Sequence, residues 1–117
     1  MQSMILIYGN ENAWAEMSEA ERANGFAAFM EYNKKLASSG ALRGGGQLQP
    51  SRTARTVKAK DGKLVTVDGP FAETREQLGG YYVVEVETHE AATALAAECP
   101  AAWGGAIEVR PLLPSNF

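Results

Sequence analysis

The chain has few of the residues from which metal, disulfide and cofactor sites are built. Its 117 residues include one cysteine, Cys99, and one histidine, His89. A single cysteine forms no internal disulfide, and one cysteine and one histidine far apart in sequence are too few ligands for zinc. The glycine run at residues 44–46 lacks the following lysine and hydroxyl residue of a phosphate-binding loop. We therefore expect no metal, no cofactor, a small buried side chain at Cys99 and a surface position for His89.

Long apolar runs and excess positive charge are also missing. The longest apolar stretch, residues 4–8, is far shorter than the roughly 20 residues that span a bilayer. A net charge of −3 and a pI near 5.2 give no electrostatic attraction to nucleic acid or to an anionic membrane. The first residues lack the basic start of a signal peptide. We expect a cytoplasmic protein with neither a membrane nor a nucleic-acid partner.

The residues that are present indicate one globular domain over residues 1–117. The hydrophobic fraction is 45% and the charged fraction 21%, close to globular averages. Ser18 and Glu21 have the spacing of a capping box, and Gly40 suits a left-handed helix end, so a helix is predicted over 18–39. A second helix is predicted from Thr88 toward Pro100. Alternating or β-branched stretches predict strands over residues 4–8, 41–49, 52–59, 64–67, 81–87 and 106–112.

Two local patterns add detail to these elements. In the first helix, apolar residues at helical spacing predict one buried stripe, formed by Phe26, Phe29, Met30 and Leu36. Asp61-Gly62 is typical of a type I′ turn and predicts a hairpin between the third and fourth strands.

The order of these elements predicts an α+β fold of ferredoxin-like type. It reads β-α-β, a hairpin insertion, then β-α-β, with an antiparallel sheet and both helices on one face. The other face is left uncovered, although the first strand is apolar on both sides. An exposed apolar sheet face would be unfavourable in water, so we expect a homodimer with the two sheets face to face.

The turn Asp68-Gly69-Pro70-Phe71 directly follows a predicted strand. Aspartate accepts hydrogen bonds from nearby amides, glycine tolerates positive φ and proline fixes φ, so the turn is expected to be stiff. One interpretation is purely structural, with Phe71 in the core. The next residues, Thr74 to Gln77, have the spacing of a second capping box and predict a short helical turn. In the other interpretation, this stiff loop positions Glu73, Arg75 and Glu76 for a site.

The stretch from Val67 to Tyr82 resembles the signature of the DGPF-domain branch of the YCII-related family. Residues 4–9, 45–50 and 105–111 are also similar, so the resemblance covers nearly the whole chain. It implies a ferredoxin-like fold that dimerises into an α/β barrel. Many members are domains of unknown function, and some are encoded beside extracytoplasmic-function sigma factors.

One departure from the family pattern bears on activity. Other YCII-related proteins, including a dechlorinating enzyme acting on chloromuconolactones, carry a histidine near the first helix beside an aspartate that precedes a Pro-Phe pair. Asp68 matches that aspartate with Gly69 inserted, but the first helix here contains no histidine. This difference argues against a His–Asp acid/base mechanism.

The candidate site combines charges from the last strand and the turn. Glu108 and Arg110 lie on the strand face opposite Ile107 and Val109, which would place them inside a dimeric barrel. Such charges need partners. One interpretation is a structural ion-pair network at the dimer interface, and the other is a polar pocket for a small organic acid. The candidate binding residues are Arg43, Arg75, Glu108, Arg110 and Tyr81.

Two functions follow from these candidates. In the first, Asp68 or Glu73 moves a proton on the bound acid in an isomerase- or lyase-like reaction. In the second, the protein is a non-catalytic accessory or ligand-sensing module associated with extracytoplasmic-function sigma factor regulation. The sequence leaves open whether the protein is an enzyme.

Overall fold

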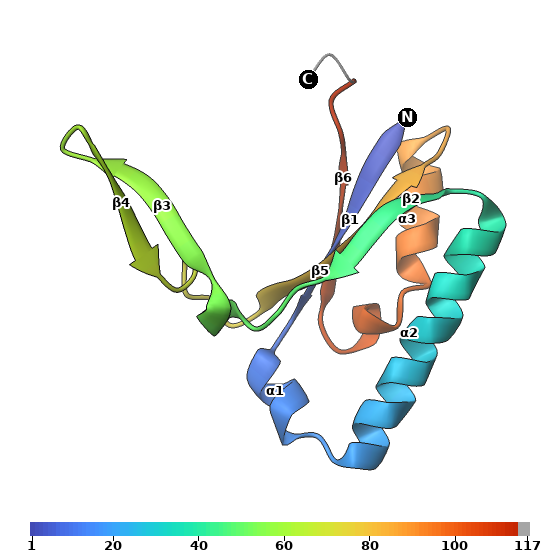
Figure 1. Cartoon of the computed structure of the whole chain (residues 1–117). Helices are drawn as coiled ribbons and strands as arrows, with labels where there is room; N and C mark the ends of the chain where they lie inside the picture. Colours follow the sequence, from blue (N-terminus) through green and yellow to red (C-terminus); the bar gives the residue numbers. More distant parts are fainter. Residues whose placement is uncertain (115–117) are drawn as a thin grey trace.

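Residues 1–114, which the computed structural model describes, form six strands, three α-helices and two short 3₁₀ helices, labelled η (Figure 1). The expected domain boundary at residue 117 lies outside these residues. The elements in chain order are β1 (Gln2–Gly9), α1 (Glu11–Glu16), α2 (Glu19–Ser39), β2 (Leu42–Gln47), η1 (Ser51–Thr53), β3 (Arg55–Lys60), β4 (Lys63–Asp68), β5 (Gln77–Glu85), α3 (His89–Ala97), η2 (Pro100–Trp103) and β6 (Ala106–Pro111).

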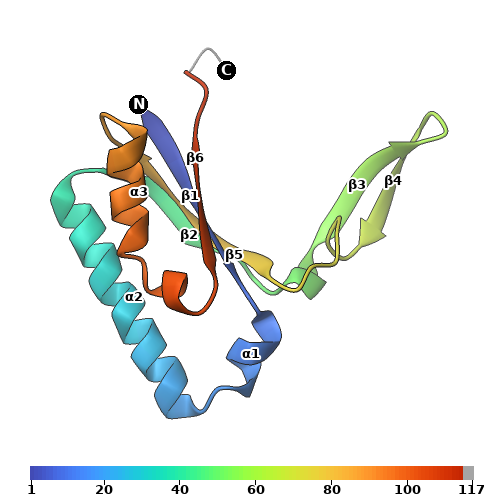
Figure 2. The same cartoon turned by 180° about the vertical axis from the view of Figure 1, so that it is seen from behind.

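A four-stranded antiparallel sheet in the order β2-β5-β1-β6 forms the centre of the molecule. Helices α2 and α3 cover one of its faces (Figures 1 and 2). This arrangement confirms the predicted ferredoxin-like α+β fold. The hairpin β3–β4 forms a separate two-stranded sheet, with positive φ at Asp61 (52°) and Gly62 (77°), as a type I′ turn requires.

The core lies between the sheet and the two helices. Ile5 on β1, Val84 on β5, Leu36 on α2 and Cys99 are almost completely buried. Burying a side chain of this size stabilises the fold by about 1.5–3 kcal/mol. Two further contacts join α2 to β5 and to α3: the rings of Tyr32 and Tyr82 meet edge to face, with centroids 5.6 Å apart, and the Tyr32 hydroxyl donates to the Leu95 carbonyl at 2.7 Å.

The predicted ends of α2 are confirmed. Ser18 Oγ accepts from the Glu21 amide at 3.1 Å, and the Glu21 carboxylate accepts from the Ser18 amide at 3.0 Å. These hydrogen bonds from Ser18 lower the pKa of Glu21. At the other end, Gly40 adopts a left-handed φ of 79°.

The predicted buried stripe of α2 is confirmed at Phe29 and Leu36 and wrong at Phe26 and Met30. Phe26 is 62% exposed and Met30 47% exposed, whereas Tyr32 and Leu36 are buried and Phe29 is half-buried. The reason is tertiary: the first turns of α2 run past the end of the sheet, so helical periodicity there has no surface to pack against (Figure 1).

Two predictions about the turn after β4 are also wrong. Phe71 is 80% exposed and does not enter the core. Residues 74–76 form no helical turn; instead Thr74 Oγ1 donates to the Glu76 carbonyl at 2.5 Å, and the Gln77 side chain donates to the Thr74 carbonyl at 2.6 Å. Gln77 already pairs with Gly9 in the sheet, so the backbone pairing of β5 overrides the local capping pattern.

The short helix α1 was not predicted from the sequence. The Asn10 side chain caps it by accepting from the amides of Asn12 and Ala13 at 2.9 and 3.2 Å. Six residues are too few to show the periodicity by which longer helices are recognised. Asn10 was the available signal, because asparagine is a favoured helix cap.

Candidate functional site

The sheet face opposite α2 and α3 carries two rows of side chains. In one row Tyr81 on β5, Leu6 on β1 and Glu108 on β6 lie side by side. In the next row Val83, Met4 and Arg110 do the same. We call this surface the open face, and it comprises Met4, Leu6, Tyr8, Tyr81, Val83, Glu108 and Arg110.

The open face follows directly from strand alternation. Ile5, Tyr82 and Val109, which are register partners, pack against the core on the helix side, so their neighbours along each strand point the other way. The apolar centre of the face is half-buried by neighbouring side chains and is not covered by either helix. Polar side chains at the edge of this face therefore have apolar side chains as their neighbours on the sheet.

A hydrogen-bonded cluster of Tyr8, Glu108 and Arg110 lies at the β1–β6 side of the open face. The Tyr8 hydroxyl lies 3.3 Å from Glu108 Oε1, and Arg110 Nε donates to Glu108 Oε2 at 2.9 Å. The terminal guanidinium nitrogen of Arg110 also pairs with the same carboxylate. Glu108 is therefore held from both sides, while the 69% exposed Arg110 side chain keeps donors that face outward.

Tyr81 lies across Leu6 from this cluster and next to a glycine. A Cβ atom built on Gly46 would lie 3.6 Å from the Tyr81 ring, so the absence of a side chain there leaves that ring edge uncovered. Tyr81 thus adds a second hydroxyl to the open face. The structure brings together three of the predicted site residues, Tyr81, Glu108 and Arg110, and adds Tyr8.

Tyr8 was not among the predicted site residues. It was assigned only to a buried strand because it ends an apolar run. The signal that identifies it is its position two residues beyond Leu6, since residues at i and i+2 share a strand face.

The other predicted site residues lie elsewhere in the protomer. Asp68, at the end of β4, faces Arg55 across the hairpin, with Oδ1 3.9 Å from Nε, and its side chain is 94% exposed. Glu73 and Arg75 are exposed in the irregular segment between β4 and β5. Arg43 donates to the carbonyls of Gly40 and Leu42 at 2.7 and 3.2 Å. Among residues 1–114 of one protomer, none of these four residues forms an ion pair with Glu108 or Arg110.

The base of the hairpin is fixed by a glutamate that sequence reasoning also missed. The Glu11 carboxylate accepts from the Ser51 amide at 2.6 Å and from its hydroxyl at 2.8 Å. The Glu11 amide in turn donates to the Gln77 side chain at 3.0 Å. These bonds tie α1 to η1, which precedes β3, and to the start of β5, and so set the direction in which the hairpin leaves the sheet.

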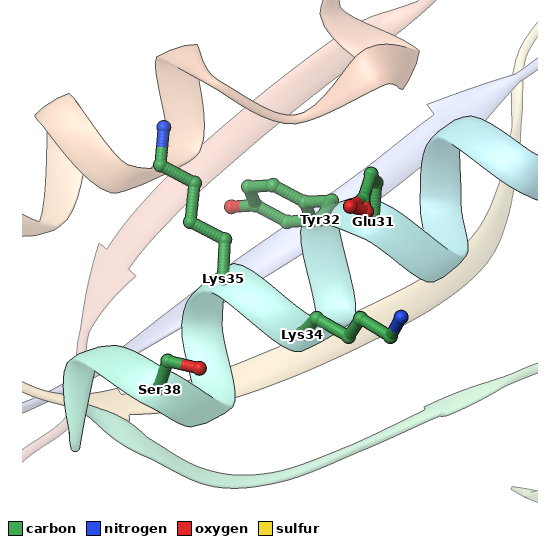
Figure 3. A pocket seen from close by; sticks show the side chains of 5 residues that line it. All are labelled: Glu31, Tyr32, Lys34, Lys35 and Ser38. Carbon is green, nitrogen blue, oxygen red and sulfur yellow. The ribbon is translucent and has the colours of Figure 1, made fainter.

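A shallow hollow lies on the outer surface of α2, away from the open face. It is lined by Glu31, Tyr32, Lys34, Lys35 and Ser38 (Figure 3). Lys34 and Lys35 leave the helix in different directions (Figure 3). The Lys35 ammonium pairs with the carboxylate of Glu98, at the end of α3, at 2.6 Å. The lysines therefore do not converge on a common ligand position, and the hollow contains none of the predicted site residues.

The groups whose pKa is raised belong to the core or pack against it. Burial raises the pKa of Tyr32, of Tyr82 and of the Cys99 thiol. A thiol with a raised pKa is a poor nucleophile at neutral pH. Among residues 1–114 no group of three or more histidine, cysteine or carboxylate side chains is arranged to hold a metal ion, and no helix is long and apolar enough to cross a membrane.

Comparison with known proteins agrees with this architecture. The model of the YCII-related domain matches residues 1–116. A curated relative from Rhizobium meliloti (strain 1021), named Uncharacterized protein R00369, is 31% identical over 110 residues, covering 92% of this chain and 89% of the relative.

Proposed function

This chain is a member of the YCII-related family, and from that premise we propose that it is a homodimer whose paired open faces hold a small organic acid at Arg110. The observation that carries the proposal is the cluster of Tyr8, Glu108 and Arg110 on a sheet face that neither helix covers. A second protomer on this face would remove Met4, Leu6 and Val83 from water. It would also enclose the cluster.

The chemistry of the open face suits a carboxylate ligand. Guanidinium groups bind carboxylates through two parallel hydrogen bonds, and Arg110 has donors beyond those used by Glu108. The Tyr81 hydroxyl adds a neutral donor on the same face, whereas the Tyr8 hydroxyl donates to Glu108. Enclosure by a second sheet would lower the local dielectric constant and strengthen each of these interactions. Apolar surroundings with a few convergent polar groups are typical of small-molecule sites.

Proton transfer by Asp68 or Glu73 is the catalytic form of the proposal. A general base must come within about 2.6–3.2 Å of the proton it abstracts. Asp68 ends β4 and Glu73 lies between β4 and β5. In a dimer, this part of the chain would have to lie close to the bound acid. The resulting reaction would be isomerase- or lyase-like, and Arg43 or Arg75 would help to anchor the substrate.

One observation favours the non-catalytic alternative. Asp68 is almost fully exposed and pairs with Arg55 rather than with an open-face residue. In this alternative the protein binds the acid without transforming it, as an accessory or ligand-sensing module linked to extracytoplasmic-function sigma factor regulation. Substrate turnover by wild type, abolished in Asp68→Ala but not in Glu90→Ala, an exposed carboxylate on α3, would decide for the enzyme.

The binding proposal is tested by ligand-induced thermal stabilisation. The purified protein is screened against small mono-, di- and hydroxycarboxylates at neutral pH. A ligand present at 100 times its dissociation constant stabilises by about 2.7 kcal/mol, which for a chain of this size raises Tm on the order of 10 °C.

The Arg110→Gln variant should lose most of this stabilisation. The matched control is Arg22→Gln, because Arg22 lies on α2 and donates to the Ala15 carbonyl at 3.4 Å, away from the open face. An undiminished shift in Arg110→Gln would refute the site.

A further inference from the structure

The β3–β4 hairpin leaves the protein on the side of the open face. In both views α2 and α3 lie on one side of the sheet and the hairpin extends away on the other (Figures 1 and 2). We call residues 55–68 the arm. The arm and the open face border the same space, so a second protomer placed against the open face comes beside the arm.

One face of the arm is apolar and uncovered. The register places Val57 opposite Thr66 and Ala59 opposite Leu64, so these four side chains share a face. Val57 is 61% exposed and Leu64 78% exposed. An isolated two-stranded hairpin is only marginally stable in water and gains stability when a face is packed.

The opposite face of the arm is partly occupied. Lys58, Val65 and Val67 lie on it, and the Lys58 ammonium lies 5.9 Å from the centroid of the Phe71 ring, which follows the arm. Val65 is correspondingly half-buried. The Val57–Leu64 face is therefore the side against which no other part of residues 1–114 packs.

The arm is held firmly where it joins the rest of the protein. The Gly69 amide donates to the Ala54 carbonyl at 2.7 Å, and Thr56 Oγ1 donates to the Gly69 carbonyl at 2.9 Å. Together with the bonds from Glu11 to Ser51, these contacts close the base of the hairpin. A projecting element with a fixed base presents its apolar face in a defined direction, which lowers the entropy lost on docking.

The charge distribution favours a second copy of this chain as the partner. Four basic and two acidic side chains give the arm a net charge of +2, and since the whole chain carries −3, the rest carries −5. An arm from one protomer and the body of another therefore attract each other. Three of the basic residues, Lys58, Lys60 and Lys63, lie toward the tip of the arm.

We infer that each arm docks through its Val57–Leu64 face on the partner protomer, with its lysines against the partner's carboxylates. This inference rests on the open-face dimer described under Proposed function. It adds a reciprocal clasp, in which the two arms hold the two sheets together and close the sides of the enclosed space.

Sedimentation equilibrium of matched variants tests the clasp. Leu64→Glu places a charge on the docking face and should raise the dimer dissociation constant at least 10-fold. Phe26→Glu changes another exposed hydrophobic residue, on α2, and should leave the dissociation constant unchanged. Circular dichroism and Tm at low concentration establish that both variants fold.

Zero-length cross-linking of wild type gives a second readout. Carbodiimide treatment of a mixture of ¹⁴N- and ¹⁵N-labelled protein, reannealed into mixed dimers, should join arm lysines of one isotope to body carboxylates of the other. If the dimer persists unchanged in Leu64→Glu, or if arm lysines link only within one chain, the clasp is refuted while the open-face dimer stands. A monomeric wild type refutes both.

Discussion

Tyr8 and Glu108, 100 residues apart in the chain, meet through a 3.3 Å hydrogen bond across the β1–β6 pair. The two residues lie on diagonal positions of neighbouring strands, since Glu108 faces Leu6 in the register and Tyr8 faces Ala106. The same carboxylate accepts from Arg110 on its other oxygen. Because the Tyr8 hydroxyl also donates to the Glu108 carboxylate, that carboxylate neutralises the positive charge of Arg110 less completely.

The first prediction concerns this sharing of charge. Tyr8→Phe removes the hydroxyl, so Glu108 compensates Arg110 more fully and the arginine attracts an acid less strongly. A hydrogen bond to a charged group contributes about 1.5–3 kcal/mol, so the dissociation constant of a ligand found in the screen should rise roughly 10-fold or more. Isothermal titration calorimetry measures it. Tyr32→Phe, on the helix side of the sheet, should leave that affinity unchanged.

The second prediction concerns Gly105, which directly precedes β6 and packs closely against the backbone of β1. A Cβ on Gly105 would lie 2.1 Å from the Tyr8 carbonyl oxygen, whereas one on Gly104 meets nothing within 4 Å. Gly105→Ala must displace backbone and should destabilise the protein by about 1–3 kcal/mol. Gly104→Ala should fall within about 0.5 kcal/mol of wild type. Urea unfolding compares the two variants, and equal stabilities would contradict the packing described here.

The third prediction concerns a buried hydroxyl. Ser3 is completely buried on the helix side of β1, and its Oγ has no hydrogen-bond partner among the described residues. Leaving such a group unpaired costs about 1–3 kcal/mol, so Ser3→Ala should raise the free energy of unfolding by about 1 kcal/mol. Ser3→Thr keeps the unpaired hydroxyl and adds a methyl group to a packed site, and should lower it. A destabilised Ser3→Ala would indicate that the hydroxyl is bonded.

The fourth prediction concerns alkaline pH. Burial raises the pKa of Tyr32 above its ordinary value of 10.0 and that of Cys99 above 9.0. The folded state therefore holds these protons more tightly than the unfolded state. The associated stability is fully present below pH 9 and is lost as the pH rises above it. Chemical unfolding at pH 7 and at pH 10.5 should show this decline.

Tyr32→Phe is the diagnostic variant for the alkaline effect. It should cost about 1 kcal/mol at pH 7, because the Leu95 carbonyl loses its donor, and should show a smaller decline between the two pH values. A decline in Tyr32→Phe as large as in wild type would assign the effect to other groups.

Sequence reasoning succeeded where local chemistry or strand alternation determines the result. The ends of α2 follow from Ser18 and Gly40, and the hairpin turn follows from Asp61-Gly62. Alternation likewise anticipated that Glu108 and Arg110 would share a face opposite Ile107 and Val109, and the structure places them so. These features depend on residues close together in the chain.

Features that depend on tertiary contacts could not be predicted in the same way. Phe26 has the spacing of a core residue but lies where α2 has passed the sheet. Phe71 follows a stiff turn but lies along the arm near Lys58. The bond between Glu11 and Ser51 joins segments 40 residues apart without a motif that marks either one. For the site, Asp68 was grouped with Glu108 because both are charged, while the protomer places them on separate sheets.

The enclosed site at Arg110 requires the open face to be an interface between two copies of this chain. Multi-angle light scattering on wild type at micromolar concentration tests it most directly, without a ligand or a variant. A homodimer is expected to have a mass about twice the 12.5 kDa of one chain. A mass of one chain at that concentration would contradict the dimer, and with it the enclosed site at Arg110.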